Sequence, residues 1–218
     1  EETSVTLVPG DNLITVTVFD VLGNSNTTTL TVHFDDQLPS IDITSPTALA
    51  TASTTDTPLL LGGTASDLTG TLALVDASQV TWQNTTTGGS GVATLTGNSW
   101  SALIPLTSGV NSVQVFASDA AGNSASDLLT VTYDPAAPLV TIQGPTTDLP
   151  YTPGPPPVIL SGIARDDVGV SSVTWSSNAA IIPAGGSAGG TLENWTAPIE
   201  LAPGANLLTI TAMDAVGR

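Results

Sequence analysis

The sequence predicts an all-β protein made of tandem antiparallel β-sandwiches. Three observations support this fold class. One residue pattern recurs along the chain at intervals of 99 and 95 residues. The segments between turn residues alternate apolar and polar side chains, and no segment shows sustained helical periodicity. Of the 218 residues, 40% are hydrophobic, which is enough apolar material for a folded core.

The recurring pattern occupies residues 7–24, 106–123 and 201–218. It begins with Leu-x-x-Gly-x-Asn, continues as an alternating segment and ends with Asp-x-x-Gly-Asn, except that Arg218 stands where the other two copies have Asn. An upstream Leu-x-Gly-x-Ala-x-Asp run, ending at Asp67 and again at Asp166, extends the match. The sequence therefore predicts the end of one copy (1–38), a complete copy (39–137) and a third copy that lacks its last strand (138–218).

Alternation within the complete copy predicts its strands. In residues 111–119, Val113, Val115 and Ala117 fall on one face, and polar residues occupy the other. Seven strands are expected, near 39–44, 58–67, 78–84, 90–96, 99–106, 111–119 and 126–134. Seven short strands in about 99 residues are typical of an antiparallel sandwich.

Turn residues separate the last strands of each copy. Asp-x-x-Gly-Asn favours a hairpin turn, because Asp accepts backbone N–H bonds and Gly supplies a positive φ. Leu-x-x-Gly-x-Asn predicts a second turn in which Gly again takes the special backbone position. Asp-Asp-Gln-Leu-Pro (35–39) and Asp-Pro-Ala-Ala-Pro (134–138) predict short, fairly stiff joints between copies.

These motifs carry a family resemblance. The Asp-Ala-Ala-Gly-Asn turn before Leu-Thr-Val-Thr-Tyr-Asp, the Asp-Pro-x-x-Pro joint and the following Ile-x-x-Pro-Thr resemble bacterial Ig-like repeats. These include repeats similar to domain B of glucodextranase. The resemblance implies a bacterial, extracellular, non-catalytic β-sandwich used as a stalk, spacer or adhesive unit. It implies no shared ligand site, so none is carried over.

Composition excludes several function classes. The formal net charge is −17, from 19 acidic and 2 basic residues. A chain this acidic does not neutralise phosphates, so no nucleic-acid partner is expected. Membrane insertion is not expected either, because no 18-residue apolar run occurs. Without Cys and with His33 as the single His, the chain offers no zinc, haem or iron–sulfur site and no Cys nucleophile.

The four Trp residues are candidates for either core packing or sugar stacking. Trp82 and Trp175 fall on a predicted third strand, where Ig sandwiches often bury a Trp, so we expect both to be largely buried. Trp100 and Trp195 begin a later strand beside polar residues, so we expect them to be half-buried. Glycan contact is the alternative for all four, and contact between modules is a further alternative for Trp100 and Trp195. His33 is expected to be an exposed strand residue, and Arg165 to pair with the adjacent acidic residues.

Acidic residues gather at the turns and joints. Calcium binds six to eight oxygens, often from loop carboxylates. Asp119, Asp134 and Asp35 are therefore the calcium candidates, and no other cofactor is expected. The alternative is that these residues only cap turns and carry solvated charge, because no Asp-x-Asp-x-Asp loop occurs. We also expect no catalysis, since the carboxylates lie on turns of repeated modules with few aromatic residues nearby.

The function expected from these observations is structural. We expect the chain to be an extracellular segment of a bacterial surface stalk, adhesin or fibre. Its expected partners are neighbouring repeats of the same or an identical chain. Strand edges poorly guarded by Lys favour self-assembly. The alternative is a carbohydrate-binding or accessory module of a secreted polysaccharide-active enzyme or adhesin, with surface glycans as partners.

Two explanations compete for the incomplete copies at the two ends. Either the chain is a window on a longer array, or a neighbouring molecule donates the missing strand. The strand pair near 1–20 recurs at 199–218, and a subunit built for end-to-end complementation should not carry this duplicate. The longer array is therefore the favoured expectation.

Overall fold

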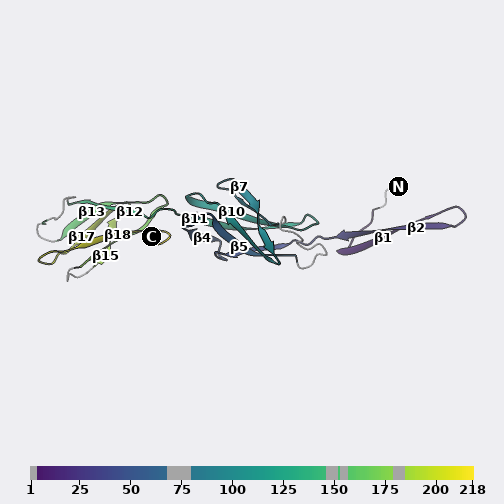
Figure 1. Ribbon diagram of the computed structural model, residues 1–218, viewed down its shortest axis with the longest axis horizontal. Helices are drawn as coiled ribbons and strands as arrows, with labels where there is room; N and C mark the ends of the chain where they lie inside the picture. Colours follow the sequence, from purple (N-terminus) through teal and green to yellow (C-terminus); the bar gives the residue numbers. More distant parts are fainter. Residues whose placement is uncertain (1–3, 68–79, 146–151, 153–156, 179–184) are drawn as a thin grey trace. The chain divides into compact units, whose positions relative to one another are not determined.

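A computed structural model describes residues 4–67, 80–145, 152, 157–178 and 185–218. Every regular element in these residues is a β-strand (Figure 1). The sheets are mainly antiparallel, and the exception is the segment 50–54, which runs parallel to the segment 130–134. The predicted all-β class is therefore confirmed.

The residues group into two compact units. The first comprises Glu1–Ala52, Pro58–Pro105 and Asn111–Thr130, and the second comprises Ser53–Thr57, Leu106–Val110 and Val131–Arg218. The first unit thus holds the hairpin of copy one and most of copy two. The second unit holds copy three together with short segments of copy two.

The hairpin of copy one consists of β1 (Gly10–Phe19) and β2 (Ser25–Phe34), labelled in Figure 1. The two strands pair in register from Gly10 opposite Phe34 to Phe19 opposite Ser25. Val16 and Val18 are exposed, whereas the equivalent Val115 and Ala117 of copy two are fully buried. The pattern of copy one is therefore that of a core-facing hairpin whose apolar face is uncovered within the described residues.

Copy two forms two sheets. One has the order β3 (Ser40–Ser45), β5 (Leu59–Ser66), β9 (Ser99–Ile104), β8 (Thr94–Thr96). The other has the order β4 (Thr51–Thr54), β11 (Ser124–Tyr133), β10 (Gly109–Ser118), β6 (Val80–Asn84), β7 (Gly89–Val92). Their inner faces bury Leu61 and Ile104 from the first sheet against Val80 and Val113 from the second, as expected for a sandwich.

Copy three repeats this arrangement. One sheet has the order β12 (Leu139–Gly144), β13 (Val158–Arg165), β17 (Asn194–Ile199), β16 (Gly189–Gly190). The other has the order β15 (Gly185–Ser187), β14 (Val170–Ser177), β18 (Leu208–Asp214). Leu160, Val173, Trp195 and Ile199 belong to its buried core.

In copies two and three, one segment changes from one sheet to the other. In copy two, β7 pairs with β6 and β8 pairs with β9, and the single residue Ala93 lies between them. Ala93 is buried and donates its N–H to the carbonyl of Val80 at 2.8 Å. Ala188 repeats this in copy three, where its N–H bonds the carbonyl of Val173 at 2.9 Å. The two layers of each sandwich are therefore joined through one continuous backbone crossing.

The largest core side chains are Trp rings laid over glycines. Trp100 on β9 lies opposite Gly63 on β5, and Trp195 on β17 lies opposite Gly162 on β13. A Cβ on Gly63 would fall on the carbonyl oxygen of Asp42 and 2.9 Å from the Trp100 ring. These glycines are thus needed where a neighbouring backbone and an indole approach at the same point.

The burial of the Trp residues corrects part of the expectation from sequence. Trp100 and Trp195 are 3% and 1% exposed rather than half-buried, because their strands lie inside the sheets, between β5 and β8 and between β13 and β16. Trp175 is buried as predicted. Trp82 is only half-buried. Its ring lies over Gly91 on the edge strand β7, as the ring of Trp175 lies over Gly186 on the edge strand β15.

The predicted turns are confirmed in their backbone geometry. In the Asp-x-x-Gly-Asn turns, Gly23, Gly122 and Gly217 have φ values of 89°, 97° and 89°. In the other motif the glycines at the three equivalent positions likewise have positive φ, with values of 98°, 90° and 100° for Gly10, Gly109 and Gly204. Asn closes that second turn: the Asn12 side chain accepts from the Val8 N–H at 2.9 Å and donates to the Val8 carbonyl at 2.7 Å.

Candidate functional site

The Asp of each Asp-x-x-Gly-Asn turn is fixed by hydrogen bonds within the turn. Asp119 Oδ1 accepts from the N–H groups of Gly122 and Asn123 at 2.8 and 2.9 Å. Asp119 Oδ2 accepts from the Asn123 side chain at 2.8 Å. Asp20 and Asn24 make the same contacts in copy one. The turn therefore holds its carboxylate in one orientation.

In the first unit this turn meets two other acidic residues. Asp35, from the joint after β2, and Asp67, after β5, each place a carboxylate oxygen within 4.8 Å of the other and of Asp119. Asn123 ties the turn to the joint by donating from its side chain to the carbonyl of Asp35 at 3.2 Å. We call Asp35, Asp67 and Asp119 the first acidic cluster.

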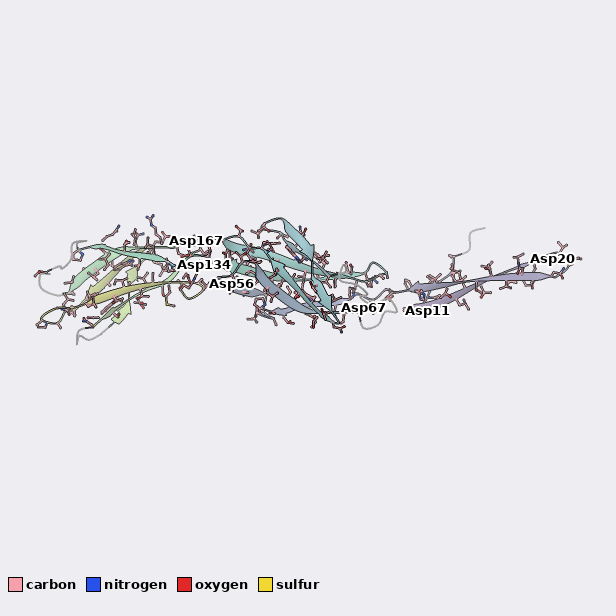
Figure 2. The ribbon with its side chains drawn as sticks, viewed as in Figure 1. Asp11, Asp20, Asp56, Asp67, Asp134 and Asp167 are labelled. Atoms are coloured by element: carbon pink, nitrogen blue, oxygen red, sulfur yellow. The ribbon has the colours of Figure 1, made fainter. Side chains whose placement is uncertain are left out.

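The second unit contains another acidic cluster, in which Asp134 and Asp166 are the counterparts of Asp35 and Asp67. Asp134, Asp166 and Asp167 bring carboxylate oxygens within 4.8 Å of one another, and we call them the second acidic cluster. Figure 2 labels Asp134 and Asp167 from this cluster and Asp67 from the first. Asp167 also accepts a hydrogen bond from the Ser108 hydroxyl at 2.6 Å.

Arg218 lies at the second acidic cluster. Its Nη2 donates to Asp134 Oδ1 at 2.9 Å, to the Asp134 carbonyl at 2.6 Å and to the Ala136 carbonyl at 2.8 Å. Its Nε lies 3.4 Å from Asp214 Oδ2. Since Arg218 occupies the position of Asn123, the two clusters differ in whether the residue closing the turn carries a positive charge.

The electrostatics of the two clusters follow from burial and these contacts. Burial acts to raise the pKa of Asp119, but hydrogen bonds from Asn123 and Gly122 outweigh it and hold the pKa below the ordinary Asp value. Burial raises the pKa of Asp134, and the charges of Asp166 and Asp214 add to this in spite of Arg218. Asp214 has a lowered pKa, because its hydrogen bonds to the turn and the Arg218 charge outweigh burial.

The three calcium candidates from sequence occupy these two clusters. Asp35 and Asp119 lie together in the first acidic cluster, and Asp134 lies in the second acidic cluster. Sequence reasoning did not include Asp67, Asp166 or Asp167 among the candidates. The signal was present in the repeat itself, because Asp67 and Asp166 end the same Leu-x-Gly-x-Ala-x-Asp run.

The remaining charged candidates lie apart from the clusters. His33 is exposed as predicted, but its Nδ1 contacts the carboxylate of Asp11, directly opposite on β1. The expected pairing of Arg165 with neighbouring acids is not present among the described residues, and Arg165 is exposed.

The half-buried Trp82 borders an open depression on the sheet that contains β10, β6 and β7. Its volume is about 470 Å³. Aromatic and amide side chains line it together with small residues: Thr81, Trp82, Gln83, Ser90, Gly91, Val92 and Phe116.

Comparison with known proteins adds distant structural likenesses. No family model and no curated protein matches the chain. Fibronectin(III)-like modules of Clostridium thermocellum CbhA are 16% identical, with a TM-score of 0.38, over 81% of this chain and 86% of that chain. A tetra-tandem repeat from the extending region of a large adhesion protein is 19% identical, with a TM-score of 0.37, over 96% of this chain and 58% of that chain.

A chimeric titin Z1Z2 tandem is 14% identical, with a TM-score of 0.30, over 82% of this chain and 93% of that chain. Likenesses at these identities and TM-scores assign no function to this chain. Among the described residues, no helix is long and apolar enough to cross a membrane.

Proposed function

We propose that the chain is a non-catalytic, extracellular structural segment of a bacterial surface stalk, adhesin or fibre. The observation that carries this proposal is the equivalence of copies two and three. Each buries its own core around a Trp laid over a glycine, with Trp100 over Gly63 in one copy and Trp195 over Gly162 in the other. Modules that are separately cored and joined by short Pro-containing linkers suit a spacer, because each added copy extends the chain without new packing.

Mechanical unfolding tests the modular role. Copy two spans residues 39–137, so its unfolding should release roughly 330–360 Å of extended chain at about 3.3–3.6 Å per residue. Pulling the chain from its ends by atomic force microscopy should show separate force peaks, one of them with this extension. A single featureless extension at low force would contradict a load-bearing module.

The location is tested on intact cells of the source bacterium. Antibodies raised against the chain should label the surface of non-permeabilised cells or the secreted fraction. Labelling that requires permeabilisation would contradict the extracellular assignment.

Trp82 and its depression favour a second candidate function, which is glycan contact by a binding or accessory module. Trp82 is half-buried, and Gln83 and Ser90 supply hydrogen-bonding groups beside it. A screen against soluble and immobilised polysaccharides tests this candidate. Binding should be lost in Trp82→Ala and kept in Trp195→Phe, whose ring lies in the other unit. If no glycan binds, the glycan-binding candidate is rejected and only the spacer role remains.

A further inference from the structure

We propose that the joint between copies two and three contains a self-cleaving peptide bond, Asp134–Pro135, and that the Arg218 guanidinium activates it. The carboxylate of Asp134 attacks the carbonyl carbon of its own peptide bond, and the chain divides into residues 1–134 and 135–218. The reaction consumes water, occurs once in each chain, and does not depend on the structural role proposed above.

The bond itself is chemically special. Asp134–Pro135 is the one Asp–Pro pair in the sequence. When any other residue follows an Asp, its backbone nitrogen can attack the Asp carboxyl and close an imide ring without breaking the chain. Proline has no backbone N–H, so this competing reaction is closed to Asp134. A reaction between its carboxylate and the peptide bond that follows can only take place at the carbonyl carbon.

The carbonyl of this bond is held by a cation. Arg218 Nη2 donates to the Asp134 carbonyl oxygen at 2.6 Å and to Asp134 Oδ1 at 2.9 Å. One nitrogen therefore holds the reacting carboxylate and the reacting carbonyl of the same residue close together. It also lies beside the oxygen that becomes negative when the carbonyl carbon is attacked, which is the position of an oxyanion donor in acyl transfer.

The other carboxylate oxygen of Asp134 is available for the attack. Oδ1 accepts from Arg218 and from the Ala136 N–H at 3.3 Å, whereas Oδ2 is shielded from solvent and has no hydrogen-bond partner among the described residues. Asp134, labelled in Figure 2, is fully buried, whereas Pro135 is exposed. The attacking oxygen is thus unsolvated, which is costly for a carboxylate, while water reaches the residue that leaves.

The bond changes balance with one water molecule. Asp134 Oδ2 bonds to the carbonyl carbon, and the carbonyl electron pair moves onto the oxygen beside Arg218. This pair returns as the C–N bond breaks, which leaves a cyclic anhydride at Asp134. Water opens the anhydride to a side-chain and a main-chain carboxylate, and both of its protons go to the Pro135 nitrogen. Nothing is oxidised or reduced.

The first joint, residues 35–39, shares part of this arrangement. Asp35 has the same unpartnered Oδ2, and its Oδ1 accepts from the Gln37 N–H at 3.0 Å. However, Asp36 follows it instead of proline, and its carbonyl accepts from the neutral Asn123 side chain at 3.2 Å. An unpartnered carboxylate oxygen therefore occurs in both joints, whereas the second joint alone combines it with a proline and a charged donor.

The test is the rate at which the purified, folded chain cleaves itself at neutral pH, in buffer with EDTA and protease inhibitors. Intact-mass spectrometry over several weeks should show residues 1–134 and 135–218 accumulating, with a rate constant that does not depend on protein concentration. The same chain unfolded in urea is the reference, because it has the same bond without the Arg218 contact. The folded chain should cleave at least about tenfold faster. Absence of these fragments from the folded chain, or an equal rate in urea, would overturn the proposal.

Substitutions separate the roles of the groups. Arg218→Gln should slow cleavage at least about tenfold because the charged donor is lost, and Pro135→Ala should abolish both fragments. Arg165→Gln is the matched control, since it removes the other basic side chain of the second unit, which is exposed, and it should leave the rate unchanged. An unchanged rate in folded Arg218→Gln would overturn the role given to the guanidinium.

Building the same groups into the first joint gives the sharper result. Asp36→Pro alone should cleave after Asp35 no faster when folded than in urea. Asp36→Pro combined with Asn123→Arg should cleave after Asp35 at least about tenfold faster than Asp36→Pro alone. Equal rates in the two folded variants would contradict the mechanism, because the natural site would then need more than the groups named here.

Discussion

At the scale of single residues, backbone carbonyls set the strictest constraint in this fold. Gly162 lies opposite Trp195, and a Cβ there would fall on the carbonyl oxygen of Thr141 and 2.5 Å from the indole. A carbonyl held in a strand pairing has no rotamer to change, unlike a side chain. The collision therefore has to be relieved by displacing β12 from β13.

Gly162→Ala should consequently destabilise copy three by about 2–3 kcal/mol, the upper part of the usual range of about 1–3 kcal/mol for overpacking a core. Urea denaturation followed by Trp fluorescence measures the change. Gly189→Ala in the same sheet is the control, because its added Cβ would meet its nearest atom at 3.7 Å, and a change within about 0.5 kcal/mol is expected. Equal effects of the two substitutions would contradict the constraint.

The turn carboxylates are set by hydrogen bonds, as the exposed Asp20 shows most simply. A hydrogen bond from the Asn24 side chain, assisted by backbone bonds, holds the pKa of Asp20 below the ordinary Asp value. A lowered folded-state pKa means that the ionised turn is favoured above the unfolded pKa of about 3.9. This contribution is lost as the pH falls through the lower folded value.

Asn24→Ala should therefore raise the pKa of Asp20 toward its ordinary value. Carbon-detected NMR titration of the Asp20 carboxyl in both proteins measures it directly. The equivalent pair in copy two, Asp119 and Asn123, should titrate as in the wild type, which controls for global change. If the titration of Asp20 is unaltered in Asn24→Ala, the lowered pKa of Asp20 comes from backbone N–H hydrogen bonds alone.

At the scale of elements, alternation located most strands of copy two within a few residues, for example β10 at Gly109–Ser118 against the predicted 111–119. The predicted strand at 78–84 is observed from Val80, and its first two residues lie outside the described part. β4 was missed, because Thr51–Thr54 is too short and too polar to alternate visibly. The segment 90–96 was predicted as one strand but divides at Ala93, where the chain passes from one sheet to the other. The alternation of apolar and polar residues does not reveal such a change of sheet.

The candidate site was predictable to the same limited extent. The turn and joint Asp residues were found because Gly and Pro mark those positions. Which carboxylates meet depends on the long-range pairing of strands, and a single sequence does not reveal it. Likewise, the burial of each Trp depends on which strand and which glycine lie beside it, and these neighbours come from distant parts of the chain.

The hairpins of copies one and two share their sequence pattern, but their apolar faces differ in solvent exposure. Amides in β1 and β2 should therefore exchange hydrogen much faster than those in β10 and β11, because Val16 and Val18 are exposed whereas Val115 and Ala117 are buried. Hydrogen–deuterium exchange of the 218-residue chain, read by mass spectrometry, should show a difference of at least about a hundredfold. Equal protection would mean that something covers the first hairpin in solution.

At the scale of the whole molecule, charge opposes compactness. The net charge is −17, because 19 acidic residues face only 2 basic ones, so most carboxylates have no positive side chain to neutralise them. Self-repulsion of this kind destabilises the folded state and is screened over about 10 Å at 0.1 M salt. It also counteracts the pairing of strand edges between chains, which the absence of Lys would otherwise permit.

Raising NaCl from about 10 to about 150 mM should therefore raise the melting temperature by a few degrees. The experiment is done in EDTA by differential scanning calorimetry, so that the acidic clusters stay free of calcium. Choline chloride at the same ionic strength is the control and should give the same rise. A decrease, or a dependence on the monovalent cation, would contradict screening as the cause.

The backbone crossing at Ala93 and Ala188 has a consequence for how a copy comes apart. One uninterrupted segment contributes a strand to each sheet, so it links the two layers covalently. The two sheets cannot separate without breaking the hydrogen bonds between β7 and β6 or between β8 and β9. Unfolding that starts in one sheet therefore spreads to the other. Each sandwich should accordingly fail as a whole, which is the behaviour that lets a chain of such units lose one link and keep the rest.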